Sequence, residues 1–313
     1  MILCVTLNPC LDKTLWAPAW RPGDSVRGRS LCEIVGGKGV NVARALARLG
    51  RAARPATFLG GPVGATCRRL LTADDGLGPI VVETEAATRV ILTVATEGTT
   101  DQSAFFDPDP AIAPAEADAL VAAIEKALDE AGVEALTLSG SSPSPATHAV
   151  YSELIALARA RRIPVFLDTY GPAFEAIWGF WPTAIQMNRR EAAMRLRRPT
   201  VGDDDVVGLL REWRRRGVAC GIVTDGPAAA LVQFGDVLFR AFPPEIEVVN
   251  PIGSGDSMLA GLVDAWLGGG GPEAVLRRAL ACGAANAAVW DAGSIEPQTV
   301  ARLEPRVRLE PVP

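Results

Sequence analysis

The sequence contains very little histidine. His148 is the only one among 313 residues. A single histidine argues against catalysis by a Ser-His-Asp triad and against a metal site made of several histidines. We expect any proton transfer in this protein to fall to a carboxylate.

Other common features are also absent. No apolar run approaches the length of a membrane span, and no positively charged segment precedes the apolar start, so we expect no signal peptide. The six cysteines form no CxxC pair, which favours reduced thiols in the cytoplasm. A net charge of −5 and a pI near 5.2 argue against nucleic acid or an anionic membrane as partner. The net charge does not exclude an anionic small molecule as the substrate.

Short apolar runs alternate with helical stretches, which predicts βαβ units and a mainly parallel sheet in an α/β fold. The expected strands are residues 2–7, 135–139, 165–168, 184–187 and 221–224. The expected helices are residues 40–49, 114–131, 148–161, 203–216, 256–267 and 272–290. Residues 246–249 also resemble a strand, and the proline-rich end after Pro305 is expected to be a tail.

Two segments show a different pattern. Residues 11–35 contain proline, glycine and arginine with weak alternation, and residues 86–106 alternate like a hairpin with a turn near Gly98. We expect them to form a small β-sheet outside the main α/β body.

The segment Gly253-Ser254-Gly255-Asp256 precedes an amphipathic helix. Its glycines let the backbone turn N–H groups toward one point, and the helix N-terminus adds partial positive charge there. Such a turn suits a transferring phosphoryl group. A carboxylate would repel a merely bound anion, whereas Asp256 could accept the proton of an attacking hydroxyl. The alternative is that Asp256 is only the N-cap of the helix.

A second glycine-rich turn, GGKGVN at residues 36–41, also precedes an expected helix. Its glycines would allow close approach to a ligand, and Lys38 could contact a phosphate. The turn lacks the GxxxxGK[ST] pattern of a Walker A loop, and neither glycine segment fits the GxGxxG of dinucleotide folds. The alternative is a tight turn with a solvated lysine.

Three further polar turns follow expected strands, where open α/β folds bind ligands. Asp12 could accept hydrogen bonds from sugar hydroxyls or belong to an Asx turn. Asn188 and Glu191 share a face if a helix begins there, and could position hydrated Mg²⁺ or simply start the helix. Gly226, in the turn 224–226, could place its N–H against a nucleotide phosphate.

Together these motifs resemble the ribokinase-like (PfkB) carbohydrate kinase family, within it the 1-phosphofructokinase and tagatose-6-phosphate kinase group. The resemblance runs from residue 1 to about 293 and rests on TLNP at residues 6–9 with Asp12, GGKGVNVA at 36–43 and VNPIGSGDS at 249–257. It implies one kinase domain over residues 1–313, folded as a three-layer α/β/α sandwich. Residues 11–35 and 86–106 would form a β-sheet lid through which two copies make a homodimer.

The resemblance also implies roles for individual residues. Asp256 would be the catalytic base, and the anion hole for the γ-phosphate of ATP would consist of Gly253, Ser254 and Gly255. The sugar would be bound by Asp12, Gly37, Lys38 and Asn41, and its existing phosphate by Arg89. The ATP side would consist of Asn188, Glu191, Thr224 and Gly226, with Glu191 holding Mg²⁺ through water.

The chain departs from the family pattern on the ATP side. Gln186-Met187 stands where the family usually has Lys-Pro, and Ala229 replaces the second glycine of its Ser-Leu-Gly-x-x-Gly segment. Residues 139–145 lack a closing glycine, and residues 105–108 differ from a segment that commonly carries glycine near the substrate. The anion hole and the base are intact.

The leading hypothesis is ATP-dependent phosphorylation of a ketohexose monophosphate to the bisphosphate. Fructose 1-phosphate is the first choice of substrate. Tagatose 6-phosphate is the alternative, favoured by GSGD after Asn250-Pro251. A phosphorylated sugar is expected because Lys38 and Arg89 together could hold its phosphate. The competing hypothesis is a non-catalytic sensor of sugar phosphate or nucleotide on the same scaffold, suggested by the altered ATP-side segments.

Overall fold

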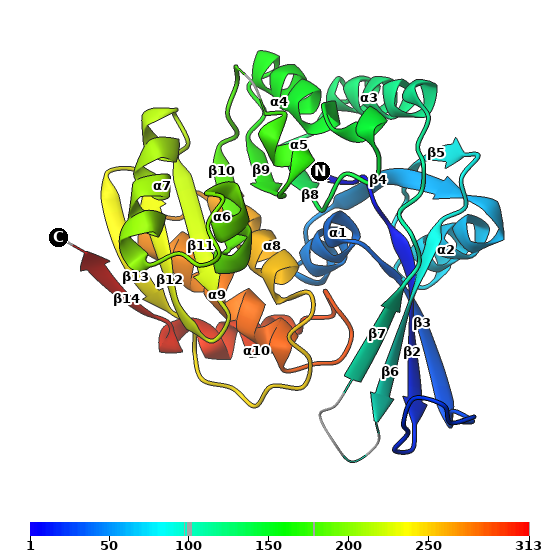
Figure 1. Ribbon diagram of the computed structural model, residues 1–313. Helices are drawn as coiled ribbons and strands as arrows, with labels where there is room; N and C mark the ends of the chain where they lie inside the picture. Colours follow the sequence, from blue (N-terminus) through cyan, green and yellow to red (C-terminus); the bar gives the residue numbers. More distant parts are fainter. Residues whose placement is uncertain (97, 99–101, 178, 313) are drawn as a thin grey trace.

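Two β-sheets organise the residues that the computed structural model describes, 1–96, 98, 102–177 and 179–312 (Figure 1). The larger sheet has ten strands in the order β14-β13-β12-β11-β10-β9-β8-β1-β4-β5. These are β1 Ile2–Thr6, β4 Ala53–Gly60, β5 Ile80–Thr84, β8 Ala135–Ser139, β9 Val165–Asp168, β10 Ala184–Asn188, β11 Cys220–Asp225, β12 Ala228–Phe234, β13 Val237–Phe242 and β14 Arg308–Val312. The strands from β5 across to β11 are parallel, and β12 to β14 pair antiparallel at the other edge.

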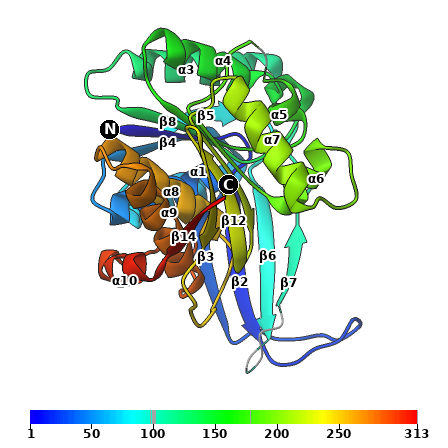
Figure 2. The same ribbon diagram turned by 90° about the vertical axis from the view of Figure 1, so that its left-hand side faces the viewer.

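Helices cover both faces of this sheet and make a three-layer α/β/α sandwich. One face carries α1 Lys38–Arg48, α2 Gly61–Ala73, α8 Ser254–Leu267, α9 Pro272–Ala287 and α10 Pro297–Leu303. The other carries α3 Pro114–Leu128, α4 Val150–Ala160, α5 Pro172–Glu175, α6 Arg189–Arg195 and α7 Asp203–Arg215. Figure 2 shows α8 and α9 on one side of the sheet and α6 and α7 on the other. The predicted α/β sandwich is confirmed.

Strand β1 shows how one strand serves two cores. Successive side chains of a strand point to opposite faces of a sheet. Ile2 and Cys4 accordingly pack in the core beneath α1 and α8, and Leu3 and Val5 pack in the core beneath α3 and α4. A strand that is apolar on both faces therefore indicates a sheet covered on both sides.

The smaller sheet has four strands in the order β3-β2-β6-β7. They are β2 Cys10–Ala17, β3 Ser30–Gly36, β6 Arg89–Thr96 and β7 Gln102–Phe106. These strands come from the two segments that the sequence assigns to a small sheet, and Figure 1 shows them extending away from the sandwich. The turn expected near Gly98 falls mainly on residues 97 and 99–101, which lie outside the described residues. A lid function for this sheet stays a prediction.

Two predictions about the C-terminal half are wrong. Residues 246–249 form no strand, because the N–H groups of Val249 and Asn250 bond to Ala287 O at the end of α9 (2.8 and 3.2 Å) instead of to a neighbouring strand. The end of the chain is not a tail, since Arg308–Val312 pairs with β13 as an edge strand. Pro311 is tolerated there because an edge strand needs fewer ladder N–H groups.

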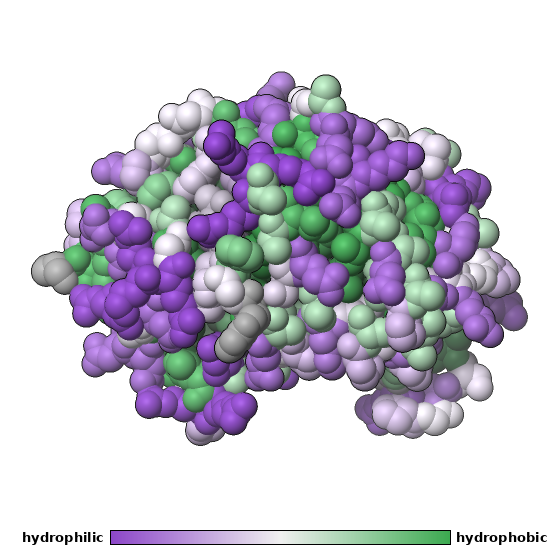
Figure 3. Space-filling model, turned by 90° about the horizontal axis from the view of Figure 1, so that it is seen from above, coloured by the Kyte–Doolittle hydropathy of each residue, from purple (hydrophilic) through white to green (hydrophobic). Residues whose placement is uncertain are grey.

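The sequence interpretation also missed several elements. Strands β4, β12 and β13 and helix α2 lie in segments for which it named no element. Among the described residues, no helix is long and apolar enough to cross a membrane. The six cysteines are free thiols. Seen from above, the surface is largely hydrophilic with apolar side chains between the polar ones (Figure 3).

Candidate active site

The carboxyl ends of several parallel strands open into one cleft of about 360 Å³. Parallel strands place the turns that follow them at the same edge of a sheet. Of the residues singled out from the sequence, those that line the cleft are Asp12, Gly37, Lys38, Asn41, Arg89, Asn188, Glu191, Thr224, Gly253, Gly255 and Asp256. Ser254 and Gly226 are not among the described residues that line it. The structure thus brings together segments from both ends of the chain.

The glycine turn before α8 has a backbone that only glycine adopts readily. Gly253 is the N-cap of the helix and has φ of +83°. A Cβ at this position would lie 2.5 Å from Cβ of Ala292, so both the dihedral angle and the space exclude a side chain. The helix begins at Ser254, and Asp256 lies in its first turn. Asp256 is therefore not the N-cap, and the capping alternative for it is wrong.

The first turn of α8 presents backbone N–H groups to the cleft. The N–H of Ser254 donates to Pro251 O at 3.2 Å, and that of Ser257 donates to Gly253 O at 2.9 Å. The N–H groups of Gly255 and Asp256 have no backbone acceptor among the described residues. Since these groups lie at the positive end of the helix, they can bind an anion in the cleft.

Asp256 is buried, with 5% of its surface exposed. Burial raises the pKa of its carboxyl to about 7; Lys38 opposes the shift, and the negative charge of Asp168 adds to it. Asn41 donates from Nδ2 to Asp256 Oδ2 at 2.8 Å, which also favours the ionised form. The carboxyl group is therefore poised to exchange a proton near neutral pH.

Lys38 is held by two carboxylates across the cleft. Its Nζ lies 2.6 Å from Asp168 Oδ1 and 3.4 Å from Glu191 Oε1. Burial lowers the pKa of Lys38, but the charges of Asp168, Glu191 and Asp256 outweigh it and raise that pKa. The lysine is thus charged and ordered, and the alternative of a solvated lysine in a tight turn is wrong.

The start of α6 is fixed by a reciprocal cap. The Glu191 N–H donates to Asn188 Oδ1 and the Asn188 N–H donates to Glu191 Oε2, both at 2.9 Å. The expected helix start at these residues is therefore confirmed. The other oxygen of Glu191 faces Lys38, and burial raises the pKa of the Glu191 carboxyl.

Gln186 and Asp168 extend this cluster. Gln186 donates from Nε2 to Asp168 Oδ2 (3.1 Å) and to Gly255 O (2.7 Å), so it ties the end of β10 to the first turn of α8. Its Oε1 is buried and has no hydrogen-bond partner among the described residues. The sequence interpretation gave Asp168 no role, although it is a carboxylate at the end of an apolar strand, as the other candidates are.

The opposite wall of the cleft carries Arg89 and Asp12. Arg89 Nη1 lies 3.1 Å from Asp109 Oδ1, and Nη2 donates to Asn8 O at 3.3 Å. Asp109 also accepts from Asn8 Nδ2 at 2.8 Å. Burial, followed by the charge of Asp291, raises the pKa of Asp12. A cation and a carboxylate thus face the cleft from the small sheet.

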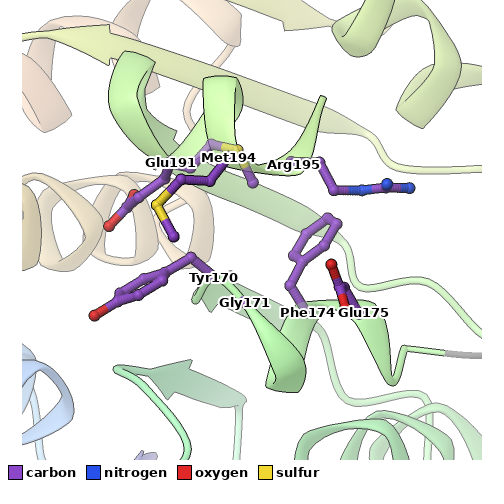
Figure 4. Close-up of a pocket in the computed structure, with 8 residues that line it drawn as sticks. Tyr170, Gly171, Phe174, Glu175, Glu191, Met194 and Arg195 are labelled. Carbon is purple, nitrogen blue, oxygen red and sulfur yellow. The ribbon is translucent and has the colours of Figure 1, made fainter. Parts of the chain in front are cut away.

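A smaller cavity of about 80 Å³ adjoins the cleft between α5 and α6. Figure 4 shows Glu191 and Met194 of α6 on one side of it and Tyr170 and Phe174 on the other. Lys38 Nζ lies 5.7 Å from the ring centroid of Tyr170, so this ring also borders the charged cluster.

Comparison with known proteins agrees with this arrangement. Residues 5–298 match the model of the pfkB family carbohydrate kinases. Phosphofructokinase-2 from Escherichia coli, in complex with fructose-6-phosphate, is 27% identical over 97% of this chain and 98% of that chain, with a TM-score of 0.84. A possible 1-phosphofructokinase from Thermotoga maritima (21% identity, 100% of both chains, TM-score 0.88) and ribokinase from Arabidopsis thaliana (17%, 97% and 98%, 0.72) share the fold.

The match covers nearly the whole chain, and the cleft combines a buried carboxylate, a helix N-terminus and ordered cations. These features suit the transfer of a phosphoryl group to a hydroxyl. The chain belongs to the pfkB family of carbohydrate kinases and is a phosphotransferase with an alcohol group as acceptor.

Proposed function

We propose that this kinase transfers the γ-phosphoryl group of ATP to a hydroxyl of a ketohexose monophosphate, with fructose 1-phosphate as the first candidate. The observation that carries the proposal is the buried Asp256 carboxylate beside N–H groups of α8 that have no backbone acceptor among the described residues. A base and an anion-binding turn at one point are what hydroxyl attack on a phosphate requires.

Asp256 acts as the general base in this proposal. A base works best when its pKa lies near the working pH, because it is then both ionised and basic enough to accept a proton. Burial gives Asp256 a pKa of about 7, far above the value of an exposed aspartate. The hydroxyl would give its proton to Asp256 as its oxygen bonds to phosphorus, and ADP would leave.

The anion hole is assigned to the first turn of α8. The N–H groups of Gly255 and Asp256 supply the donors, and Gly253 supplies the backbone turn. Ser254 contributes less through its backbone than the sequence interpretation expected, because its N–H is already bound to Pro251 O. Lys38, between Asp168 and Asp256, adds positive charge beside the transferring group.

The phosphate already present on the sugar is assigned to Arg89. This guanidinium borders the cleft, its Nε is buried without a partner among the described residues, and Asp12 lies on the same wall. A guanidinium can bind a phosphate through two parallel hydrogen bonds. Fructose-6-phosphate joins the candidates because it is bound in the Escherichia coli neighbour. Tagatose 6-phosphate stays an alternative substrate, because the GSGD turn follows Asn250-Pro251.

Kinases of this family use ATP with a divalent metal, which we assign as Mg²⁺. The described residues contain no cluster of three or more His, Cys, Asp or Glu side chains that could bind a metal ion directly. Glu191 and Asp168 still leave negative charge beside the nucleotide side of the cleft after Lys38 is counted. They fit hydrated Mg²⁺ held through water. The ion would neutralise phosphate charge.

The test is an ADP-release assay with Mg-ATP and a panel of fructose 1-phosphate, fructose 6-phosphate, tagatose 6-phosphate and free fructose. We expect turnover with a phosphorylated ketohexose and at least ~10²-fold less with Asp256→Asn. The matched control is Asp264→Asn, a buried carboxylate on the same helix that binds Arg51 and Arg278. Native turnover in Asp256→Asn would refute the base, and no turnover with any sugar would favour the sensor hypothesis.

A further inference from the structure

Arg44 uses every donor of its guanidinium group. It lies on α1 with 5% of its surface exposed. Nε and Nη2 donate to the two oxygens of Asp75 at 2.7 and 2.8 Å, and Nη2 also donates to Val35 O at 2.9 Å. The remaining two donors are those of Nη1, and a guanidinium has five in all.

The two Nη1 donors go to Ala292 O at 2.9 Å and to Asn41 Oδ1 at 3.1 Å. Arg44 therefore joins four separate segments at one point: helix α1, strand β3, the loop after α2 and the loop after α9. A Cβ on Gly293 would lie 2.7 Å from Asn41 O and 3.2 Å from Arg44 Cβ. The loop after α9 is thus packed directly against this turn of α1.

The contact with Arg44 determines which way the Asn41 amide faces. A guanidinium can only donate hydrogen bonds, so the oxygen of the amide must face Arg44. The nitrogen of the amide then faces Asp256, where Nδ2 donates to Oδ2 at 2.8 Å. Reversing the amide would oppose its oxygen to a carboxylate oxygen in a buried site, which is unfavourable.

We propose that Arg44, clamped by Asp75, is a positioning residue that keeps the N–H group of Asn41 directed at Asp256. The proposal rests on the proposed role of Asp256 as base and extends it to residues outside the cleft. Arg44 is not among the described residues that line the cleft. It acts on Asp256 through Asn41, and its bidentate pair with Asp75 gives the guanidinium the fixed orientation that this requires.

The consequence concerns the ionisation of Asp256. Several charged groups face its carboxylate: Lys38 from α1 favours the ionised form, and Asp168 from β9 and Glu191 from α6 disfavour it. Asn41 favours ionisation as a donor. Without Arg44 the oxygen of the amide loses its donor, the amide is held from the Asp256 side only, and the pKa of Asp256 would rise further.

Other charged groups surround Arg44 itself. Asp75 binds it directly, and Asp12 from β2 lies close enough for the Arg44 charge to lower the pKa of Asp12. Asp291, in the loop after α9, raises that same pKa. A substitution that keeps the positive charge at position 44 leaves these interactions largely in place and isolates the effect of the amide.

Arg44→Lys is such a substitution, because lysine keeps the charge but cannot hold five acceptors. We expect the acidic limb of kcat/KM against pH to move up by about one unit, the equivalent of one hydrogen bond to a charged group. In the Asn41→Ala background, Arg44→Lys should produce no further movement, since the amide is already gone. Each variant is assayed with Mg-ATP and the best sugar phosphate of the panel, alongside its thermal midpoint.

Arg51→Lys is the matched control. Arg51 also forms a partly buried bond with a carboxylate, to Asp264 Oδ1 at 2.7 Å, and its side chain makes no hydrogen bond to any described residue that lines the cleft. Its pH profile should coincide with that of the unaltered protein. Where Arg44→Lys does not fold, Asp75→Asn weakens the same clamp while leaving the guanidinium in place, and a smaller upward movement is expected.

Three outcomes would overturn the proposal. One is a folded Arg44→Lys variant with an unmoved acidic limb, and another is an equal movement in the Asn41→Ala background. The third is loss of folding in both Arg44→Lys and Asp75→Asn, which would assign the cluster to stability alone. Asp256→Asn is measured in parallel: retained turnover there would refute the base, whereas lost turnover with an unmoved limb would refute only the role of Arg44.

Discussion

Lys38 and Asp168 form a close ion pair, with Nζ and Oδ1 2.6 Å apart, although 130 positions separate them in the chain. The pair joins the start of α1 to the end of β9 and lies beside Asp256. Asp168 is nearly fully buried, so its charge acts on Asp256 with little screening by solvent. The ion pair therefore belongs to the electrostatics of the proposed base.

Asp168→Asn should move the pH profile in the direction opposite to Arg44→Lys. Asp168 raises the pKa of Asp256 as a like charge, so its removal lowers that pKa. Asp256 then stays ionised at lower pH, and the acidic limb of kcat/KM moves down. The measurement is kcat/KM between pH 5 and 9, with Asp264→Asn as the control. An upward movement would show that Asp168 does not act on Asp256 through charge.

Asp256→Asn should stabilise the protein at alkaline pH. Between about pH 4 and 7 the folded protein holds a proton on Asp256 that the unfolded chain releases, so stability falls as pH rises through this range. Asparagine does not titrate, so the variant does not lose stability in this range. The gain in its free energy of unfolding over the unaltered protein should therefore be near zero below pH 4 and reach its full value, at most about 4 kcal/mol, above pH 7. Thermal melts at pH 5 and 8 give the comparison. Equal differences at the two pH values would contradict the raised pKa.

Much of the fold follows from local sequence. The runs at residues 135–139 and 165–168 become β8 and β9 with the predicted bounds, because a parallel strand buried on both faces is mostly apolar. Residues 246–249 are equally apolar but form no strand, since their hydrogen bonds go to the end of α9. Composition alone does not reveal which partner a backbone segment will find.

In the candidate site, too, local sequence predicts some features, and others depend on contacts between distant segments. Turns after strands were identifiable, because glycine and polar residues interrupt apolar runs, and most of them line the cleft. Asp168 was passed over as the end of a strand, Gln186 was noted only as a departure from the family pattern, and Arg44 and Asp75 lie outside every motif. The hydrogen bond from Arg44 to Ala292 spans 248 residues of sequence, and the bond from Asn41 to Asp256 spans 215. Such contacts are set by packing of the whole chain.

Gly253→Ala and Gly255→Ala should differ in their effect on stability. Alanine at position 253 is strained by φ of +83° and would contact Ala292 at 2.5 Å, so we expect a loss of about 1–3 kcal/mol together with activity. At position 255 the nearest atom is Gln186 Nε2 at 3.5 Å, which leaves room for a methyl group. That variant should melt normally yet lose kcat, because the methyl group occupies the approach of the phosphate. Normal kcat in it would argue against the anion hole.

Arg89→Ala and Lys38→Ala should separate the two phosphate positions. Arg89 lies with Asn8 and Asp109 on the wall of the cleft that we assign to the sugar, so its loss should raise KM for the sugar phosphate by ~10-fold or more with KM for ATP unchanged. Lys38 lies between Asp168 and Asp256, and its loss should mainly lower kcat. Steady-state kinetics with each substrate varied in turn provide the test. Equal losses on free fructose and on its phosphate would contradict the role of Arg89.

The small sheet should join two copies of the chain. Phe105 and Phe106 on β7 are 53% and 64% exposed, and β7 is an edge strand of that sheet. Neighbouring residues of a strand point to opposite faces, so one of the two phenylalanine side chains lies on each face of the sheet. A second copy that covers this edge would bury them and satisfy the unpaired edge.

Phe105→Glu and Phe106→Glu should therefore weaken a dimer, and the larger effect identifies the covered face. Light scattering after gel filtration at several protein concentrations gives the mass of each variant. Phe180→Glu is the matched control, because Phe180 is also about half exposed (47%) but lies in the loop between α5 and β10, away from the small sheet. A monomer at every concentration of the unaltered protein, or a dimer unaffected by both β7 substitutions, would refute this interface. Since Asp12 and Arg89 lie on strands of the same sheet, a weakened dimer should also raise KM for the sugar phosphate more than KM for ATP.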